Sequence, residues 1–413
     1  MKFRPASGVT LISIATIVAG VAGYIVTWIV ARTVGAENYA LFAVFWSALY
    51  LVVSSLSGVQ QEITRATHPV LEGSAPRVSR ARNFGIALSV IVFIAIVLTA
   101  PLWNASLSPT NGWALVWPLA VGTSSYVLVA ALSGSLYGVA QWQSIALMVV
   151  VDALLRLLSL GVVLAFTTEI VVLAWAVAIP FAATILLVWP FIRRGVVGAT
   201  TIDAGYRRLS WNVARTVTAS ASLGAIVGGF PLLLGLTSRG ESRALLGALI
   251  LCITLARAPL VVSILSLQSL LVIQFRDNRA TFIPTFLRLN GLIFVIGALI
   301  AVPAWLFGPW LFEEFFGAEY RLEGPILALL VASSALVGAL CVSAAALLAL
   351  RRHAAYSAGF FVSALATIVA VFLPLELVER ASVALIAGPL LGLALNVIAI
   401  GLGRRLDQHG GAL

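Results

Sequence analysis

Long runs of apolar residues, separated by short polar segments, dominate the pattern of this chain. An α-helix needs about 20 apolar residues to cross the hydrocarbon core of a bilayer, and a strand of a soluble sheet would alternate apolar and polar positions instead. The pattern therefore predicts an all-α, polytopic membrane protein with twelve spans. Their expected ranges are Gly8–Val30, Tyr39–Gln61, Asn83–Trp103, Trp113–Gly134, Ser144–Phe166, Ile170–Ile192, Trp211–Leu236, Ala244–Ile273, Leu287–Phe312, Pro325–Leu350, Ala354–Leu375 and Ser382–Leu402.

Composition leads to the same fold class. Hydrophobic residues make up 61% of the 413 positions and charged residues 10%, whereas a typical soluble chain carries roughly 25% charged residues. No soluble core could hold this much apolar surface, so a soluble enzyme, a nucleic-acid-binding domain and a secreted disulfide module are excluded. The net charge of +10 is interpreted as a topology signal, and no nucleic-acid partner is expected.

The distribution of basic residues predicts the orientation. With a cytoplasmic N-terminus, seventeen Lys and Arg residues fall in segments on the inside and five on the outside. Because basic loops stay on the cytoplasmic side, both termini are predicted to be cytoplasmic. The longest central cytoplasmic segment then divides the spans six and six, which is a common plan of alternating-access transporters with a cavity between two pseudo-symmetric halves. The predicted parts are an N-terminal half (1–192), a linker (193–210), a C-terminal half (211–403) and a cytoplasmic tail (404–413).

The chain lacks the motifs of several catalytic classes. It contains no Gly-x-x-x-x-Gly-Lys-Ser/Thr loop for ATP, and its three histidines have no metal-ligand spacing. The outer loops are too short for a catalytic domain. We therefore expect a transporter without a metal or cofactor, although chemistry from a few polar groups inside the membrane stays an alternative.

Charges within the predicted spans need a reason, because each costs at least about 2.5–3.5 kcal/mol on insertion scales. Arg257 lies deep in the eighth span beside Pro259, where a guanidinium can bind an anionic group or pair with a buried acceptor. Asp152 and Arg156 have the i, i+4 spacing of a helical ion pair, which is either structural or a site where Asp152 takes up a coupling proton. Arg215, one turn inside the seventh span, either reaches the inner surface or contributes to a site.

A further polar cluster is expected at the inner end of the second span. It consists of Gln60, Gln61, Glu62 and Arg65, and Glu62 can pair with Arg65 at i, i+3. An inner gate or a contact to a lipid headgroup is one interpretation. A solvated helix end is the other.

The segment from Gly23 to Thr67, "GYIVTWIVARTVGAENYALFAVFWSALYLVVSSLSGVQQEITRAT", resembles the opening of bacterial oligosaccharide and polysaccharide (O-antigen-type) flippases. These transporters belong to the multidrug/oligosaccharidyl-lipid/polysaccharide exporter (MOP) superfamily. The resemblance includes a first span ending in Ala-Arg, a short outer turn with Gly and Tyr, and an aromatic second span that ends in Gly and Arg. The matching residues are Ala31, Arg32, Gly35, Tyr39, Phe42, Gly58 and Arg65.

The resemblance implies a cavity lined by the first, second, seventh and eighth spans, in which cationic residues hold a lipid-linked pyrophosphate. By position, Arg257 matches such a residue, and Arg65, Arg215 and Gln61 are further candidates for the substrate site. The implied function is export of a polyprenyl-diphosphate-linked oligosaccharide across the bacterial inner membrane. H⁺ or Na⁺ would be the coupling ion. Membrane lipids would surround the protein, and a glycan polymerase and glycosyltransferases would be its partner enzymes. A small-molecule or drug exporter of the same superfamily and a membrane-embedded glycan polymerase or ligase are the alternatives.

Overall fold

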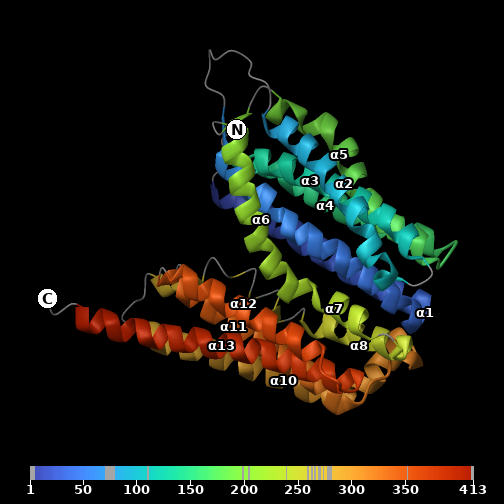
Figure 1. Ribbon diagram of the computed structural model, residues 1–413, viewed down its shortest axis with the longest axis vertical. Helices are drawn as coiled ribbons and strands as arrows, with labels where there is room; N and C mark the ends of the chain where they lie inside the picture. Colours follow the sequence, from blue (N-terminus) through green and yellow to red (C-terminus); the bar gives the residue numbers. More distant parts are fainter. Residues whose placement is uncertain are drawn as a thin grey trace. The chain divides into compact units, whose positions relative to one another are not determined.

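The structure is a computed structural model of the whole chain. It describes residues 5–69, 80–108, 111–197, 200–202, 205–238, 240–257, 281–350 and 352–410, together with 260, 261, 264, 267, 271, 272 and 274–276. Within these residues the chain is almost entirely helical (Figure 1). It forms two compact units, Met1–Leu232 and Leu233–Leu413, and each unit is treated by itself.

The first unit contains six long helices and one small sheet. Its helices are α1 (Pro5–Ala66), α2 (Arg80–Leu107), α3 (Gly112–Gly138), α4 (Trp142–Leu164), α5 (Ile170–Val196) and α6 (Tyr206–Gly228). Strands β1 (Thr67–Pro69) and β2 (Thr200–Ile202) pair antiparallel, with Thr67 opposite Ile202. This pairing attaches the middle of the predicted central linker to the segment that directly follows α1.

The second unit is also helical, and α7 (Phe230–Thr237) extends across the division between the units. The other elements are α8 (Arg243–Arg257), α10 (Phe282–Phe316), the 3-10 helix η2 (Ala318–Tyr320), α11 (Gly324–Ala349), α12 (His353–Val371) and α13 (Leu377–Gly410). Most of the predicted C-terminal tail therefore continues α13. Residues 411–413 lie outside the described part of the chain.

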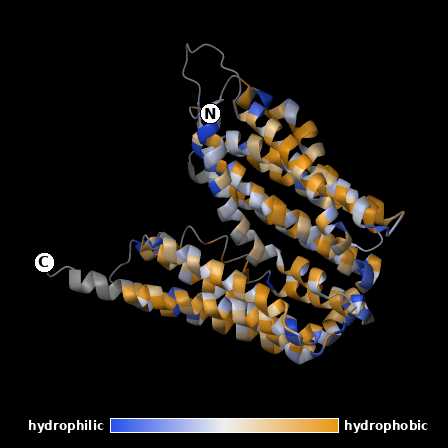
Figure 2. Cartoon of the chain, in the orientation of Figure 1, coloured by the Kyte–Doolittle hydropathy of each residue, from blue (hydrophilic) through white to orange (hydrophobic). Residues whose placement is uncertain are grey.

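Nine of the described helices are long and apolar enough to cross a membrane. One of them, Thr10–Ala66, covers two predicted spans, because two helices meet at Gly35, where the backbone is not helical. The backbone of Gly35 has φ 77° and ψ 164°, a conformation that only glycine adopts readily. The chain is thus a multi-pass membrane protein of the predicted fold class, and apolar residues predominate on most of its long helices (Figure 2).

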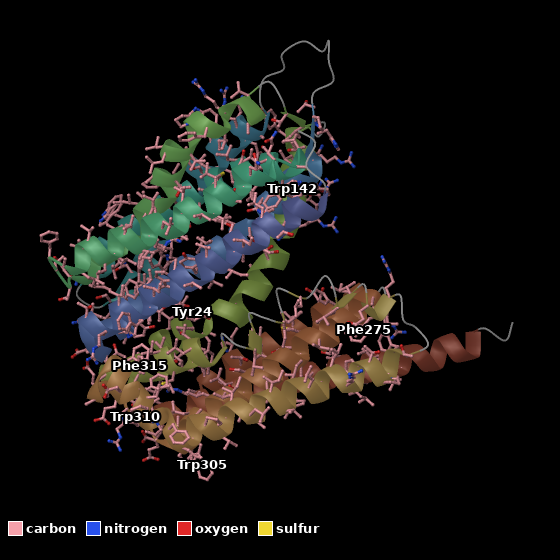
Figure 3. The ribbon with its side chains drawn as sticks, turned by 180° about the vertical axis from the view of Figure 1, so that it is seen from behind. Tyr24, Trp142, Phe275, Trp305, Trp310 and Phe315 are labelled. Atoms are coloured by element: carbon pink, nitrogen blue, oxygen red, sulfur yellow. The ribbon has the colours of Figure 1, made fainter. Side chains whose placement is uncertain are left out.

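Side chains at the end of α10 fit this membrane environment. Trp305, Trp310 and Phe315 are all exposed on the C-terminal part of this helix (Figure 3). Aromatic rings concentrate at the boundary between hydrocarbon and water, where one edge can contact lipid and the other headgroups. This end of α10 is consistent with an interfacial position.

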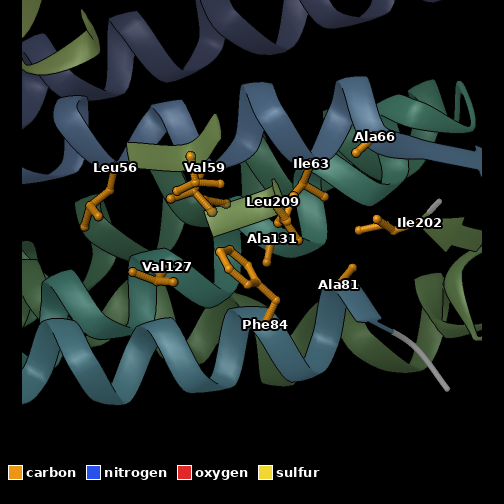
Figure 4. Close-up of a cluster of buried hydrophobic side chains, with 12 residues drawn as sticks. Leu56, Val59, Ile63, Ala66, Ala81, Phe84, Val127, Ala131, Ile202 and Leu209 are labelled. Carbon is orange, nitrogen blue, oxygen red and sulfur yellow. The ribbon is translucent and has the colours of Figure 1, made fainter. Parts of the chain in front are cut away.

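Helix α6 packs along the second part of α1, inside the first unit. A buried cluster joins α6 to α1, α2, α3 and β2 (Figure 4). Its members are Leu56, Val59, Ile63, Ala66, Ala81, Phe84, Val127, Ala130, Ala131, Ile202, Leu209 and Val213. The first compact unit thus extends beyond the sequence-based boundary at 193–210, because this packing and the β1–β2 pairing attach α6 to α1. The grouping of six spans in each half stays a prediction.

The predicted seventh span is divided into α6 and α7. A serine of α1 forms hydrogen bonds with backbone groups at the break between them. Ser47 Oγ donates to the Gly228 carbonyl oxygen at 2.6 Å and accepts from the Leu232 N–H at 3.2 Å. Backbone groups freed inside a bilayer must find such partners, because no water is present to bond them. The break is therefore compatible with a position inside the membrane.

In the second unit, α11, α12 and α13 pack closely around a buried amide. Asn396 on α13 is fully buried and donates to Ser343 Oγ on α11 at 2.9 Å. A methyl group added at Gly359 on α12 would lie 1.9 Å from Asn396 Oδ1, so only glycine leaves room for this side chain. Small residues and polar bonds of this kind replace the hydrophobic effect between helices in a membrane.

Candidate functional site

Helix α6 is the most unusual helix of the first unit, because it is long but too polar to count among the nine apolar spans. Its 23 residues would reach about 35 Å at 1.5 Å per residue. In Figure 2 its ribbon is mostly pale and blue rather than orange. A helix with this composition is not suited to contact lipid over its whole circumference.

The polar residues of α6 fall on two opposite faces. One face contacts α1, where Thr216 Oγ1 donates to the Gly58 carbonyl oxygen at 3.0 Å. The other face is exposed and carries three arginines. Its exposed residues include Arg207, Arg208, Trp211, Arg215 and Thr218, and their spacing places them on one side of a helix.

The arginines of this exposed face, which we call the α6 arginine face (Arg207, Arg208 and Arg215), have no ion-pair partner within the described residues. A hollow of about 890 Å³ adjoins the beginning of the helix. It is lined by Gly205, Arg207, Arg208, Ser210, Trp211 and Ala214. The face thus offers positive charge without a direct ion-pair partner among the described residues, beside accessible space, which suits an anionic ligand.

The predicted polar cluster at the end of the second span is present and joins α1 to α6. The carboxylate of Glu62 is buried and accepts hydrogen bonds from two residues. Arg65 Nε donates at 2.8 Å, and Asn212 Nδ2 also donates at 2.8 Å. The Arg65 side chain is 59% exposed, so Glu62 holds its guanidinium at the surface. Gln61 Nε2 lies 3.4 Å from Ser220 Oγ, a weak bond to the same helix.

The structure therefore places Gln61 against α6, the helix that carries Arg215, and links Arg65 to α6 through Glu62. Asn212, Arg207 and Arg208 were not among the predicted site residues. The sequence does contain a signal for them, since the arginines follow the spacing 207, 208 and 215 within a segment too polar for lipid. Asn212 could not be recognised, because its role depends on a tertiary contact with Glu62.

Arg257 ends α8 in the second unit and is half-buried. The turns before it are buried from Leu246 to Ile253. Pro259, which the sequence suggested would loosen the helix after Arg257, lies outside the described residues. A role of Arg257 in anion binding stays a prediction.

Asp152 and Arg156 form the ion pair that their spacing allows. Arg156 Nη1 and Nη2 donate to the two carboxylate oxygens of Asp152 at 2.8 and 3.0 Å. The arginine side chain is 9% exposed and the aspartate 23%. Its guanidinium carbon also lies 4.7 Å from the ring centre of Phe181 on α5 and 5.7 Å from that of Tyr50 on α1.

Comparison with other proteins gives the chain its family. No family model matches it. The uncharacterized protein Mb3654 of Mycobacterium bovis is 33% identical over 402 residues, which are 96% of this chain and 92% of the relative. The uncharacterized protein Rv1510 of Mycobacterium tuberculosis H37Rv is 30% identical over 401 residues, or 97% of this chain and 92% of the relative. The chain belongs to the same family as these two proteins.

Comparison with solved structures identifies the fold of this chain. An inward-facing multidrug resistance MATE family transporter of the MOP superfamily matches 93% of this chain and 95% of its own, with a TM-score of 0.70 and 14% identity. The lipid II flippase MurJ, in an inward closed conformation, matches 95% and 87% with a TM-score of 0.72 and 10% identity. The chain thus has the fold of MOP superfamily transporters.

A test of the Glu62 cluster follows from these contacts. Glu62→Gln removes the charge that holds Arg65 while keeping the side-chain shape. We expect the free energy of unfolding to fall by about 1–3 kcal/mol, because charge-assisted bonds to a buried carboxylate are lost. The apparent Tm of the purified protein measures this. Glu319→Gln is the control, because Glu319 is exposed. Equal Tm values for both variants would show that Glu62 does not stabilise the contact between α1 and α6.

Proposed function

We propose that this protein is a flippase that moves a polyprenyl-diphosphate-linked oligosaccharide across the bacterial inner membrane for surface polysaccharide biosynthesis. The observation that carries the proposal is the α6 arginine face, a row of exposed cations on a helix of a MOP-type fold. The fold comparisons support membrane transport in general. The anionic, lipid-linked cargo is inferred from the charges.

The physical argument begins with the cost of charge in lipid. Exposed arginines on a spanning helix would cost at least about 2.5–3.5 kcal/mol each if they faced hydrocarbon. Arg215 is nine residues beyond the start of α6, which is roughly 13 Å along the axis. We therefore infer that the α6 arginine face lines a water-filled path, in which an anion is the complementary ligand.

The spacing of the arginines fits a cargo with more than one negative charge. Arg208 and Arg215 are seven residues apart, about 10 Å along the helix. Guanidinium groups bind phosphate oxygens in a bidentate manner. A diphosphate headgroup could pass from the pair at 207 and 208 to Arg215, while its lipid chain stays in the bilayer.

The cycle needs a driving force besides the cargo. The sequence has no P-loop for ATP, so differential binding of H⁺ or Na⁺ to two conformations is the proposed source of energy. Glycosyltransferases would supply the lipid-linked unit on the inside, and a glycan polymerase would consume it outside. Both termini are proposed to be cytoplasmic.

Mass spectrometry of polyprenyl-linked saccharides in a deletion strain and its complemented strain tests the function. We expect one complete lipid-linked unit to accumulate in the deletion strain and to clear on complementation. A sidedness assay then separates flipping from polymerisation, because a flipping defect leaves the unit on the cytoplasmic leaflet. An unchanged pool of lipid-linked saccharides would contradict the proposal.

A small-molecule exporter of the same superfamily is the second candidate, favoured by the likeness to the multidrug MATE transporter. It predicts drug sensitivity of the deletion strain with an unchanged surface glycan. The α6 arginine face would then select anionic compounds.

Arg257 allows a test in the second unit. Arg257→Ala is expected to impair translocation about tenfold, the effect of losing one charge-assisted bond to a phosphate, while membrane insertion stays intact. Transport of the labelled lipid-linked saccharide into proteoliposomes gives the rate. Normal transport by this variant would remove Arg257 from the site.

A further inference from the structure

The Asp152–Arg156 pair lies in an enclosure built by three helices of the first unit. Asp152 and Arg156 come from α4, Tyr50 from α1 and Phe181 from α5. Trp46 stacks on Tyr50, with ring centres 4.9 Å apart, and so extends the aromatic wall along α1. We call this enclosure the Arg156 cage.

The chemistry of the cage is that of a receptor for organic cations. One carboxylate and the faces of aromatic rings form the usual environment in which proteins hold guanidinium and quaternary ammonium groups. Here the ring of Phe181 is 4.7 Å and that of Tyr50 5.7 Å from the guanidinium carbon, within the range of about 6 Å in which the attraction is significant. Both carboxylate oxygens are at hydrogen-bond distance.

Other features indicate that the guanidinium is held by the carboxylate and the rings. Arg156 Nε is buried without a hydrogen-bond partner among the described residues. The guanidinium is therefore held through its two Nη bonds to Asp152 and its contacts with the two rings. Ser159, one turn further on α4, donates to the Ala176 carbonyl oxygen at 2.7 Å and so links α4 to α5.

We propose that the Arg156 cage has the chemistry of an organic-cation site that the chain's own guanidinium occupies, so that it accepts a small organic cation only when Arg156 is removed. Arg156 occupies both oxygens of Asp152, so a mobile cation does not bind there in the native chain. Asp152 is then not the coupling site, and an organic cation is not the cargo of this pocket. The inference is independent of the proposed function, because it rests on contacts within the first unit alone.

Removal of Arg156 should leave the cage empty and able to bind a cation from solution. The full chain is purified in detergent as wild type, Asp152→Asn, Arg156→Ala and the double variant Asp152→Asn/Arg156→Ala. Apparent Tm is measured against methylguanidinium, tetramethylammonium and Na⁺. We expect no cation-specific shift for wild type, a lowered Tm for Arg156→Ala, and a saturable rise of several degrees when methylguanidinium is added to that variant.

The double variant tests the role of the carboxylate. Without Asp152 the rings alone remain, so methylguanidinium should not raise its Tm. Arg156→Ala could also fold only when methylguanidinium is present during solubilisation. That result would equally show that the added cation replaces the missing guanidinium, and it would support the proposal. No rescue under either condition would overturn the proposal, as would a Na⁺-induced rise in the wild-type Tm that Asp152→Asn abolishes, since Asp152 would then hold an exchangeable ion.

Discussion

Replacing Arg215 with alanine is expected to lower the rate of translocation by about 10- to 100-fold, the effect of losing a charge-assisted contact worth roughly 1.5–3 kcal/mol. The side chain is exposed and makes no hydrogen bond within the described residues, so stability should not fall with it. Arg215→Lys keeps the charge but loses the planar fork, and an intermediate rate is expected.

The measurement is translocation of a labelled polyprenyl-diphosphate saccharide in proteoliposomes, together with apparent Tm of each variant. Arg321→Ala is the matched control, because Arg321 is also exposed but pairs with Glu313 at 2.9 Å. Equal rates for the two alanine variants would show that the α6 arginine face is a topology signal without a role in transport. A loss of Tm in Arg215→Ala alone would assign the arginine to folding.

The membrane class of the fold could be predicted from sequence because it depends on local properties. Runs of about 20 apolar residues are visible without knowledge of tertiary contacts, and the i, i+4 spacing of Asp152 and Arg156 is enough to suggest a pair. The prediction of two spans on either side of Gly35 agrees with α1, which consists of two helices with non-helical φ and ψ at this glycine. The length of the turn was predicted less well, because residues 31–34 and 36–38 are helical.

What sequence could not supply are the contacts between distant segments. The strands β1 and β2 have three residues each and carry no periodic pattern of their own. The rings around Arg156 come from α1 and α5, and the partners of Glu62 include Asn212, which is 150 residues away. The exposed face of α6 follows from its packing on α1, so Arg215 could be placed in a span but not on a face.

The contact between α1 and α6 connects the fold to the site. Three residues along the second part of α1 contact α6 or the break that follows it. They are Glu62, Gly58 and Ser47. These contacts fix the rotation of α6 about its own axis. Because one side of the helix packs on α1, the opposite side is exposed. The orientation of the arginines is thus set by small and polar residues of α1.

Gly58→Ala is expected to disturb this arrangement more than any other single methyl group on α1. The added carbon would lie 2.5 Å from the Val217 backbone nitrogen and 2.7 Å from the Thr216 carbonyl oxygen. Backbone atoms cannot move aside as a flexible side chain does, so the helices must separate and the bond from Thr216 to Gly58 weakens. Overpacking of this kind costs about 1–3 kcal/mol, and the apparent Tm should fall.

Gly20→Ala is the matched control on the same helix, since a methyl group there meets no described atom within 4 Å. Alanine stabilises a helix interior by up to about 1 kcal/mol relative to glycine, so this variant should keep or raise the apparent Tm. Opposite signs for the two substitutions would show that close approach of α6, and not helix propensity, decides the effect at Gly58. Transport by Gly58→Ala should fall as well, because the α6 arginine face is displaced together with the helix that carries it.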